Sequence, residues 1–241
     1  MNRSIIENYW QRVDQYLPVL NWVPNLRLVS VCNNLAFGKV DQESDIDLFV
    51  VARKGRLFTV RTFVTILLHL RGVRRYGDYI AGRFCLSFFI DDSALNMKRI
   101  ALHHDIYLAY WIKSMKPVIN DGVLTDILVA NSWARDLFEE QKDFAGDNSK
   151  VFEKSFAAEI FKYIYLYTFD LVFGALLEWA LKSWQMRRAQ RKARGFGNFS
   201  GLMISESILK FHNIDRRSYY RQRWKKKYGR EKLSDERFLA L

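Results

Sequence analysis

Two aspartates separated by a single residue give the strongest chemical signal in this sequence. Asp45 and Asp47 flank Ile46 at the start of the apolar run DIDLFVVA, which ends at Ala52. Side chains two residues apart in a strand point to the same face, so a strand here places both carboxylates side by side while Ile46 turns toward the core. Adjacent carboxylates suit Mg²⁺, which completes its coordination with water and substrate phosphates. The pair is therefore predicted to hold Mg²⁺ for phosphoryl or nucleotidyl transfer.

The segment in front of this pair contains a second apolar run and a polar loop. Residues 26–32 (LRLVSVC) and 45–52 are both short, apolar and rich in β-branched residues, so both are predicted to be strands. The loop between them reads NNLAFGKVDQES and ends at Ser44. The predicted order is therefore strand, loop, strand, with the two aspartates opening the second strand.

This arrangement resembles the nucleotidyltransferase superfamily related to DNA polymerase β. Small bacterial members of that family read roughly Gly-Ser-Leu-Ala-Arg-Gly and then Ser-Asp-Ile-Asp-Leu. The chain has the same pattern without gaps, except that Asn33 and Asn34 replace Gly-Ser. The resemblance implies a Mg²⁺-dependent enzyme that binds an NTP such as ATP and in which Asp45 and Asp47 are the catalytic metal ligands. It also implies a set of nucleotide-binding residues: Asn33, Asn34, Gly38 and Ser44.

The replacement of Gly-Ser concerns the residues that approach the triphosphate in that family. Asn33 is the better tolerated substitute for glycine, because asparagine adopts left-handed backbone geometry more readily than most residues. The side-chain amide of Asn34 can donate a hydrogen bond to a phosphate oxygen. The alternative is a degenerate loop that no longer binds nucleotide.

The family also uses a third carboxylate from a later strand, and RFCLSFFIDD is the strand expected to supply it. Alternation places Cys85, Ser87 and Asp91 on one face, so Asp91 is the expected third catalytic carboxylate. Asp92 and Asp78 are weaker alternatives. Several basic residues follow the Asp45–Asp47 strand, and they are either solvent-exposed surface charges or contacts to the triphosphate. Arg61, in a predicted helix over residues 56–71, is the residue predicted to contact the triphosphate.

Composition indicates a folded and strongly basic protein. The 241 residues are 49% hydrophobic, and 38 Lys and Arg against 26 Asp and Glu give a formal charge of +12, which favours polyanionic partners. Cys32 and Cys85 lie in apolar runs, as expected of reduced, core-packed thiols rather than of a disulfide framework. The N-terminal segment has no uninterrupted apolar stretch of the kind found in secretory signals. The expected location is cytoplasmic.

Two domains are predicted. Residues 1–122 are expected to form an α/β (α+β) nucleotidyltransferase-type core with a short mixed sheet, and residues 123–241 a helical, basic C-terminal domain. No strand is predicted from about residue 95 onward. The apolar stretch 156–184 contains five ionisable residues, which argues against a transmembrane span. It is expected to be a buried bundle helix; the alternative is an interfacial helix whose basic tail, residues 187–194, meets anionic lipid as a peripheral membrane contact.

Two functions remain open from the sequence. In the first, the protein moves a nucleoside monophosphate from an NTP to an acceptor hydroxyl of RNA, a protein or a small molecule. In the second, it is a catalytically degenerate module of the same fold that binds nucleic acid, a partner protein or an anionic membrane surface.

Overall fold

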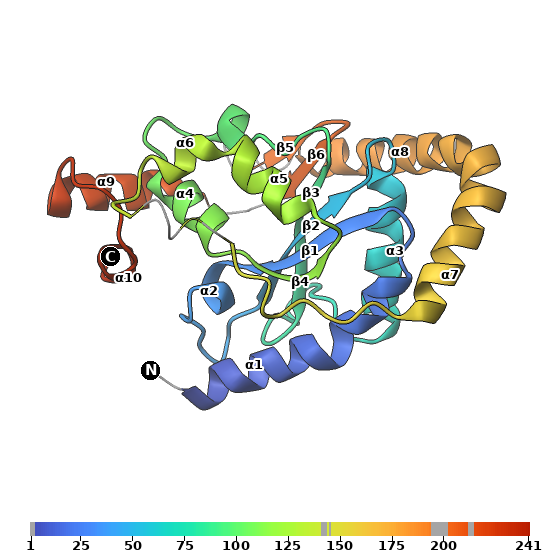
Figure 1. The fold of residues 1–241 in the computed structure, drawn as a ribbon, viewed down its shortest axis with the longest axis horizontal. Coiled ribbons are helices and arrows are strands. Elements are labelled where there is room, and N and C mark those ends of the chain that lie inside the picture. Colours follow the sequence, from blue (N-terminus) through green and yellow to red (C-terminus); the bar gives the residue numbers. More distant parts are fainter. Residues whose placement is uncertain (1–2, 141–143, 145, 194–201, 212–214) are drawn as a thin grey trace.

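A six-stranded mixed sheet forms the centre of the protein (Figure 1). The computed structural model describes residues 3–140, 144, 146–193, 202–211 and 215–241. The strand order is β4-β1-β2-β3-β6-β5, in which β2 and β3 are parallel and every other neighbouring pair is antiparallel. The strands are β1 (Leu26–Cys32), β2 (Ile46–Ala52), β3 (Phe84–Asp91), β4 (Lys116–Asn120), β5 (Leu202–Ile204) and β6 (Ile208–Phe211).

Helices cover both faces of this sheet. The N-terminal side carries α1 (Arg3–Tyr16), the 3₁₀ turn η1 (Leu17–Trp22), α2 (Asn33–Ala36) and α3 (Leu57–Leu70). The middle of the chain gives η2 (Met97–Ile100), α4 (Ile106–Lys113), α5 (Val123–Ala130) and α6 (Ser132–Arg135). The later elements are α7 (Phe156–Tyr165), the π turn η4 (Leu166–Asp170), α8 (Leu171–Ala193), α9 (Arg217–Tyr228) and α10 (Asp235–Leu239).

Two apolar cores follow from the alternation of side chains along the strands. Ile46, Leu48 and Val50 of β2 face a core shared with α1 and α3, whereas Phe49 and Val51 face a core shared with α4, α5 and the C-terminal helices. This is the two-residue period expected of strands in a three-layer arrangement. The face on which Phe49 lies is also the face of Asp47, so the predicted side-by-side carboxylates project toward α4.

The expectation that no strand follows about residue 95 is wrong, because β4, β5 and β6 all lie beyond it. β4 pairs with β1 inside the expected N-terminal domain, and β6, from the expected C-terminal domain, pairs with β3, so residues 123–241 contribute β5 and β6 to the same sheet. The predicted strands at 26–32 and 45–52 and the predicted helix at 56–71 are confirmed within one residue at each end. The structure is thus α+β with one mixed sheet.

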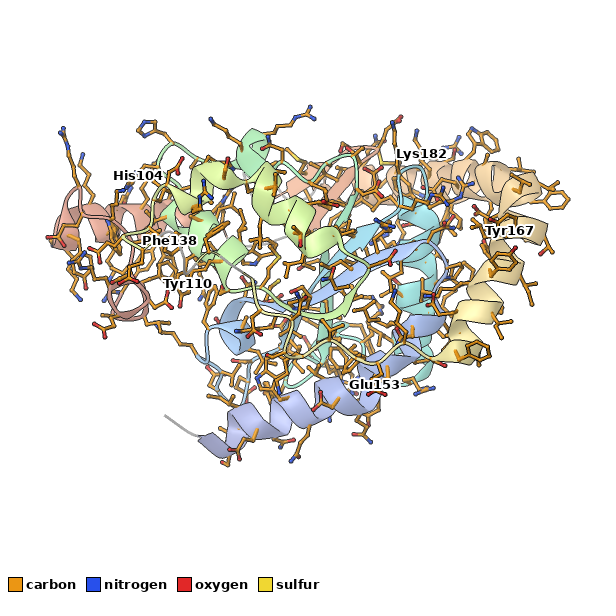
Figure 2. All side chains as sticks on the ribbon, viewed as in Figure 1. His104, Tyr110, Phe138, Glu153, Tyr167 and Lys182 are labelled. Atoms are coloured by element: carbon orange, nitrogen blue, oxygen red, sulfur yellow. The ribbon has the colours of Figure 1, made fainter. Side chains whose placement is uncertain are left out.

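The long apolar helix is exposed rather than buried. Phe156–Arg191 is the one segment of the described chain that is long and apolar enough to cross a membrane by length and composition, and only 11% of its apolar window is buried. Its side chains, among them Tyr167, lie along one end of the molecule (Figures 1 and 2). The prediction of a buried bundle helix is therefore wrong. Arg194, at the end of the predicted basic tail, lies outside the described residues.

Candidate functional site

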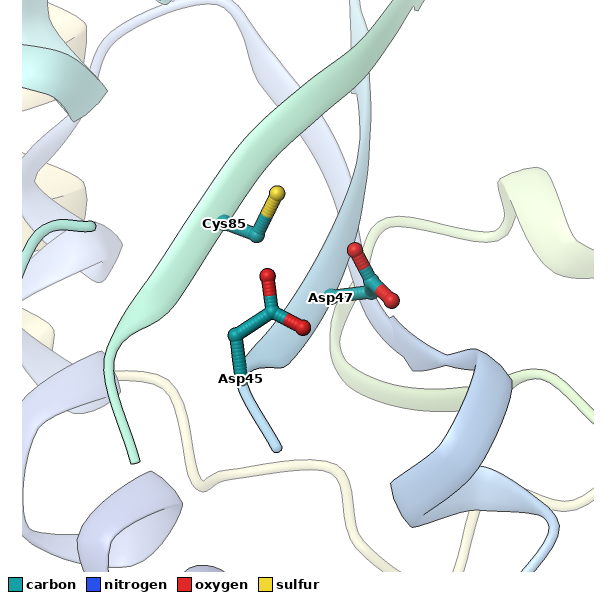
Figure 3. Close-up of side chains that lie close together, drawn as sticks. All are labelled: Asp45, Asp47 and Cys85. Carbon is teal, nitrogen blue, oxygen red and sulfur yellow. The ribbon is translucent and has the colours of Figure 1, made fainter. Parts of the chain in front are cut away.

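Asp45 and Asp47 lie at the start of β2, at one end of the sheet (Figure 3). Asp47 is the pairing partner of Cys32 in β1 and of Cys85 in β3, so it occupies a central position between two strands. Asp45 precedes the strand by one residue, and its neighbour Ile46 is completely buried on the opposite face. The prediction that the two carboxylates share a face is confirmed.

The thiol of Cys85 joins the two carboxylates. Carboxylate oxygens of Asp45 and Asp47 and the Sγ atom of Cys85 all lie within 4.8 Å of one another, close enough to hold a metal ion together (Figure 3). The parallel pairing of β2 with β3 causes this, because it sets Cys85 directly opposite Asp47. Cys85 is only partly buried, so the prediction of two core-packed thiols holds for Cys32 alone.

The donor set fits Mg²⁺ through its oxygens. Burial and the negative charges of Asp47 and Asp45 raise the pKa of the Cys85 thiol, so it is protonated at neutral pH. A neutral thiol is a poor ligand for a hard cation, whereas two carboxylates with water and phosphate oxygens are the set that Mg²⁺ prefers. Asp45 and Asp47 are therefore the residues that can hold Mg²⁺.

Asn33 connects the acidic pair to α4. It is the first residue of α2, directly after β1, and has φ 53°, so the left-handed geometry expected of this asparagine is present. Its Nδ2 donates a hydrogen bond to Asp47 Oδ2 at 2.8 Å, and its Oδ1 accepts one from the Tyr107 hydroxyl at 3.1 Å. The Asn33 amide is thus oriented at both ends and fixes the rotamer of the Asp47 carboxylate.

Electrostatics distinguish the two carboxylates. Burial and the charge of Asp45 raise the pKa of Asp47 to about 6, against the lowering effects of the Asn33 amide and Arg75. Asp45 accepts a hydrogen bond from Arg75 Nη1 at 2.5 Å, which forms an ion pair. The same Arg75 nitrogen lies 3.8 Å from Cys85 Sγ. A single guanidinium therefore neutralises part of the acidic cluster.

A pocket of about 540 Å³ opens over this cluster. Its acidic side contains the two aspartates, and its basic side is formed by Arg74, Arg75, Lys210, Arg216 and Arg217. This volume falls in the range of nucleotide-sized ligand sites, roughly 300–1,000 Å³. The remaining lining residues are Asn33, Asn34, Tyr76, Gly77, Cys85, Leu86, Ser87, Phe88, Tyr107, Leu108, Trp111, Phe211 and Asp215.

Two of the basic residues have distinct environments. Lys210 of β6 is buried with its Nζ 5.8 Å from the centre of the Phe88 ring, and burial together with the charge of Arg217 lowers its pKa to about 8. Arg217 is bound through Nη2 to Asp215 at 2.6 Å and through Nη1 lies 3.5 Å from Asp105. Lys210 is therefore the more readily recruited of the two for an anionic ligand.

The prediction that Asp91 supplies the third carboxylate is wrong. Asp91 pairs with Ala52 at the far end of β2, six residues along β3 from Cys85, which corresponds to roughly 20 Å. An irregularity in the pairing after Cys85 also reverses the alternation, so that Phe88 lies on the face of Asp47 and Phe89 on the other. The Asp91 carboxylate instead accepts hydrogen bonds from the backbone and hydroxyl of Ser93.

The weaker alternatives for that carboxylate are also engaged or positioned elsewhere. Asp92 accepts a hydrogen bond from the Lys54 backbone N–H at 2.9 Å, beside the far end of β2. Asp78 is an exposed residue of the turn between α3 and β3 and does not line the pocket.

Arg61 lies on the opposite side of the sheet from the acidic pair, so its predicted contact with the triphosphate is wrong. Its guanidinium lies 5.7 Å from the Phe89 ring and 5.2 Å from the Phe211 ring, and it donates to Gln185 Oε1 at 2.5 Å. Phe89 belongs to the core under α3, whereas Asp47 faces α4.

The other predicted nucleotide-binding residues divide into one that lines the pocket and two that shape the loop. Asn34 lines the pocket. Gly38 has φ 68° and closes the turn after α2 with its N–H bonded to Leu35 O at 3.1 Å. The Ser44 hydroxyl donates to Asp41 Oδ1 at 2.7 Å, so it holds the loop rather than facing the pocket.

Four residues of the site are not predicted from the sequence: Cys85 as a neighbour of the metal ligands, Arg75, Tyr107 and Lys210. Alternation in the sequence puts Cys85 on the strand face of the expected third carboxylate, and only the strand register brings it opposite Asp47. The other three come from separate elements that meet only in the folded chain.

A scan of the chain against protein-family models finds no matching family, and a search of curated proteins finds no match either. The geometry of the site is therefore the basis on which function is inferred.

Proposed function

We propose that this protein is a Mg²⁺-dependent nucleotidyltransferase that moves a nucleoside monophosphate from an NTP to an acceptor hydroxyl. The observation that supports this most strongly is the pair of same-face carboxylates at the start of β2, opposite a basic pocket wall. A mixed sheet with the acidic pair at the start of a strand also agrees with the nucleotidyltransferase-type core that the motif resembles.

Asp45 and Asp47 are the residues that would hold Mg²⁺, and the bound ion would offset the negative charge of the triphosphate. Asn33 holds the Asp47 carboxylate, which lines the pocket, through a hydrogen bond to Oδ2. Arg75 would exchange its contact with Asp45 for a phosphate oxygen when a cation takes its place, since a guanidinium binds both groups in the same way. Lys210 and Arg216 extend this positive wall toward the β- and γ-phosphates.

The acceptor is proposed to be a hydroxyl of RNA or of a protein. The pocket wall that includes Arg216 continues into the exposed basic face of α9, which carries Lys225, Lys226 and Lys227 in its last turn. Such a surface attracts polyanions through phosphate contacts. RNA is the acceptor that this charge favours, and a protein hydroxyl is the alternative.

A non-catalytic module of the same fold is the second candidate. Cys85 occupies the position opposite Asp47 from which a third carboxylate would reach the metal, and Arg75 already pairs with Asp45. Both features favour binding without transfer, because a general base for the acceptor hydroxyl is then missing. Such a module would bind nucleic acid, a partner protein or an anionic membrane surface.

The deciding experiment is incubation of the purified protein with Mg²⁺ and each α-labelled NTP, with total RNA or total protein as acceptor. The test variant is Asp45→Asn/Asp47→Asn, and the matched control is Asp14→Asn, an exposed aspartate of α1. Label transfer by the wild type and the control, but not by the double variant, supports the enzyme. Nucleotide binding by calorimetry without transfer supports the module, and the absence of both nucleotide binding and transfer rejects the enzyme.

A further inference from the structure

The helix pair α7–α8 presents its apolar side to solvent. Phe173, Leu176 and Trp179 are 51%, 61% and 66% exposed. Apolar residues continue through α7 and the π turn, where the exposed side chains are Phe156, Ile160, Phe161, Tyr163, Ile164, Tyr167 and Phe169. Contiguous apolar surface of this kind marks a site of interaction with a membrane or a protein.

The polar side of the same helix faces inward. Glu178 is buried and accepts hydrogen bonds from the backbone N–H groups of Phe58 and Thr59 at 2.9 and 2.8 Å, so its carboxylate caps the start of α3. Asp170 is ion-paired with Arg56 at 2.7 Å. An ordinary surface helix has the reverse arrangement, with its apolar stripe inward. The outer side of α8 is therefore suited to an apolar environment rather than to water.

Arg188, which is exposed on α8, lies near two largely buried arginines, Arg61 and Arg74. Burial, together with the nearby charges of Arg74 and Arg188, lowers the pKa of Arg61 to about 10. Within the described part of the chain, none of the three forms an ion pair with a carboxylate, and the Nε atoms of Arg61 and Arg74 are buried without a hydrogen-bond partner. Such a cluster attracts an anion.

The positive charge continues along α8 itself. Phe173, Trp184 and Arg191 follow one another at intervals of 11 and 7 residues, about three and two helical turns, so they lie on one exposed stripe. The Arg188 guanidinium lies 5.9 Å from the Trp184 ring. A helix face that is apolar and aromatic over most of its length and carries arginines at its end matches the boundary between acyl chains and anionic headgroups.

We infer that the exposed face of α7 and α8 docks onto an anionic membrane surface, with the apolar side chains at the acyl boundary and the exposed arginines Arg188 and Arg191 on the lipid phosphates. This binding is peripheral, because Glu178 and Asp170 keep α8 bonded to α3 and its N-terminal loop. A second copy of the chain is the less suitable occupant, since it carries the same charge of +12. The inference does not depend on the proposed catalytic activity.

The experiment is sedimentation of the full chain with two kinds of vesicle, one of phosphatidylcholine alone and one of equal parts phosphatidylcholine and phosphatidylglycerol. The apolar variant is Phe173→Glu/Leu176→Glu, and the basic variant is Arg188→Gln/Arg191→Gln, all at exposed positions. The control is Val129→Glu, 72% exposed on α5, which covers the other face of the sheet. Circular dichroism verifies that each variant is folded.

The wild type and the control are expected to bind the anionic vesicles but not the neutral ones, and high salt is expected to release them from the anionic vesicles. Each double variant is expected to bind about tenfold or more weakly. Equal binding by the apolar variant overturns the proposal. Resistance of wild-type protein to alkaline carbonate extraction overturns it in favour of a spanning helix. A concentration-dependent dimer that does not bind vesicles and that Leu176→Glu dissociates overturns it in favour of a second copy.

Discussion

Replacement of Asp47 by asparagine is expected to stabilise the metal-free protein above neutral pH. Burial and the charge of Asp45 raise the pKa of Asp47 to about 6, so ionisation of this carboxylate opposes folding. For a group whose pKa is raised in the folded state, the stabilising contribution is complete below the unfolded pKa and is lost as the pH rises through the folded value. Above about pH 7 the native protein therefore carries the full cost, which is absent from the Asp47→Asn variant.

The size of the effect follows from the shift. The pKa rises from 3.8 to about 6, and one unit corresponds to roughly 1.4 kcal/mol, which sets an upper limit of about 3 kcal/mol. Asp47 faces an open pocket, so water reduces the cost, and a gain of about 1 to 2 kcal/mol is expected. The side-chain amide of the variant still offers an oxygen to the Asn33 Nδ2 donor, so this hydrogen bond is kept and the substitution itself costs little stability.

Urea denaturation in the presence of a chelator measures this difference. The free energy of unfolding of Asp47→Asn minus that of the wild type is expected to be positive at about pH 8 and to approach zero near pH 4. The control Asp14→Asn removes one exposed negative charge and is expected to show no such pH dependence. With Mg²⁺ added, the wild type gains stability through binding and Asp47→Asn does not. A loss of stability at pH 8, or a gain that is the same at every pH, refutes the reasoning.

Three further substitutions test other parts of the site and its support. Cys85→Asp places a carboxylate opposite Asp47 and is expected to tighten Mg²⁺ binding at least about tenfold by calorimetry, whereas the uncharged Cys85→Ser is not. Glu178→Ala removes the cap of α3 and is expected to lower the free energy of unfolding by about 2 to 3 kcal/mol in urea, against less than about 1 kcal/mol for Glu159→Ala, which removes a half-exposed ion pair with Lys162. Asn33→Gly is expected to raise the pKa of Asp47 further, measured by carboxyl NMR, because a donor is lost; Asn33→Ala also costs about 1 to 2 kcal/mol for its left-handed backbone. If the two variants of a pair behave alike, the corresponding interpretation is contradicted.

The strands and helices that can be predicted are those with an unambiguous pattern. Short β-branched runs predict β1 and β2, and helical periodicity predicts α3. β4 escapes prediction because KPVIN is short and contains a proline, and β6 because four residues next to a polar turn carry little periodicity. Strands of this length form because neighbours in the sheet pair with them, which a local pattern does not contain.

The orientation of α8 cannot be predicted from helical periodicity alone. A helical pattern shows that polar and apolar residues lie on different sides, but it does not state which side meets the protein. In the sequence, Glu178 and Asp170 are ionisable interruptions of an apolar stretch, and in the structure they are its buried contacts with α3 and Arg56. The partner groups that receive these side chains lie more than 100 residues earlier in the chain.

The site is predictable as far as it depends on one strand. The common face of Asp45 and Asp47 follows from alternation, whereas Cys85, Arg75 and Lys210 depend on the register of β3, the loop before it and the pairing of β6. The prediction for Asp91 fails for the same reason, since one extra residue in β3 changes which side chains share a face.

The last part of the chain supports a site whose carboxylates come from the first fifth. The Tyr107 hydroxyl that bonds Asn33 belongs to a ring packed 4.9 Å from Tyr220 and 6.2 Å from Phe238, and the pocket wall includes Lys210. During synthesis on the ribosome, the acidic pair therefore emerges long before its basic wall and the aromatic brace behind Asn33. A nascent chain that has reached only α8 has the aspartates without the pocket, so ligand binding would begin only once the final helices have been made.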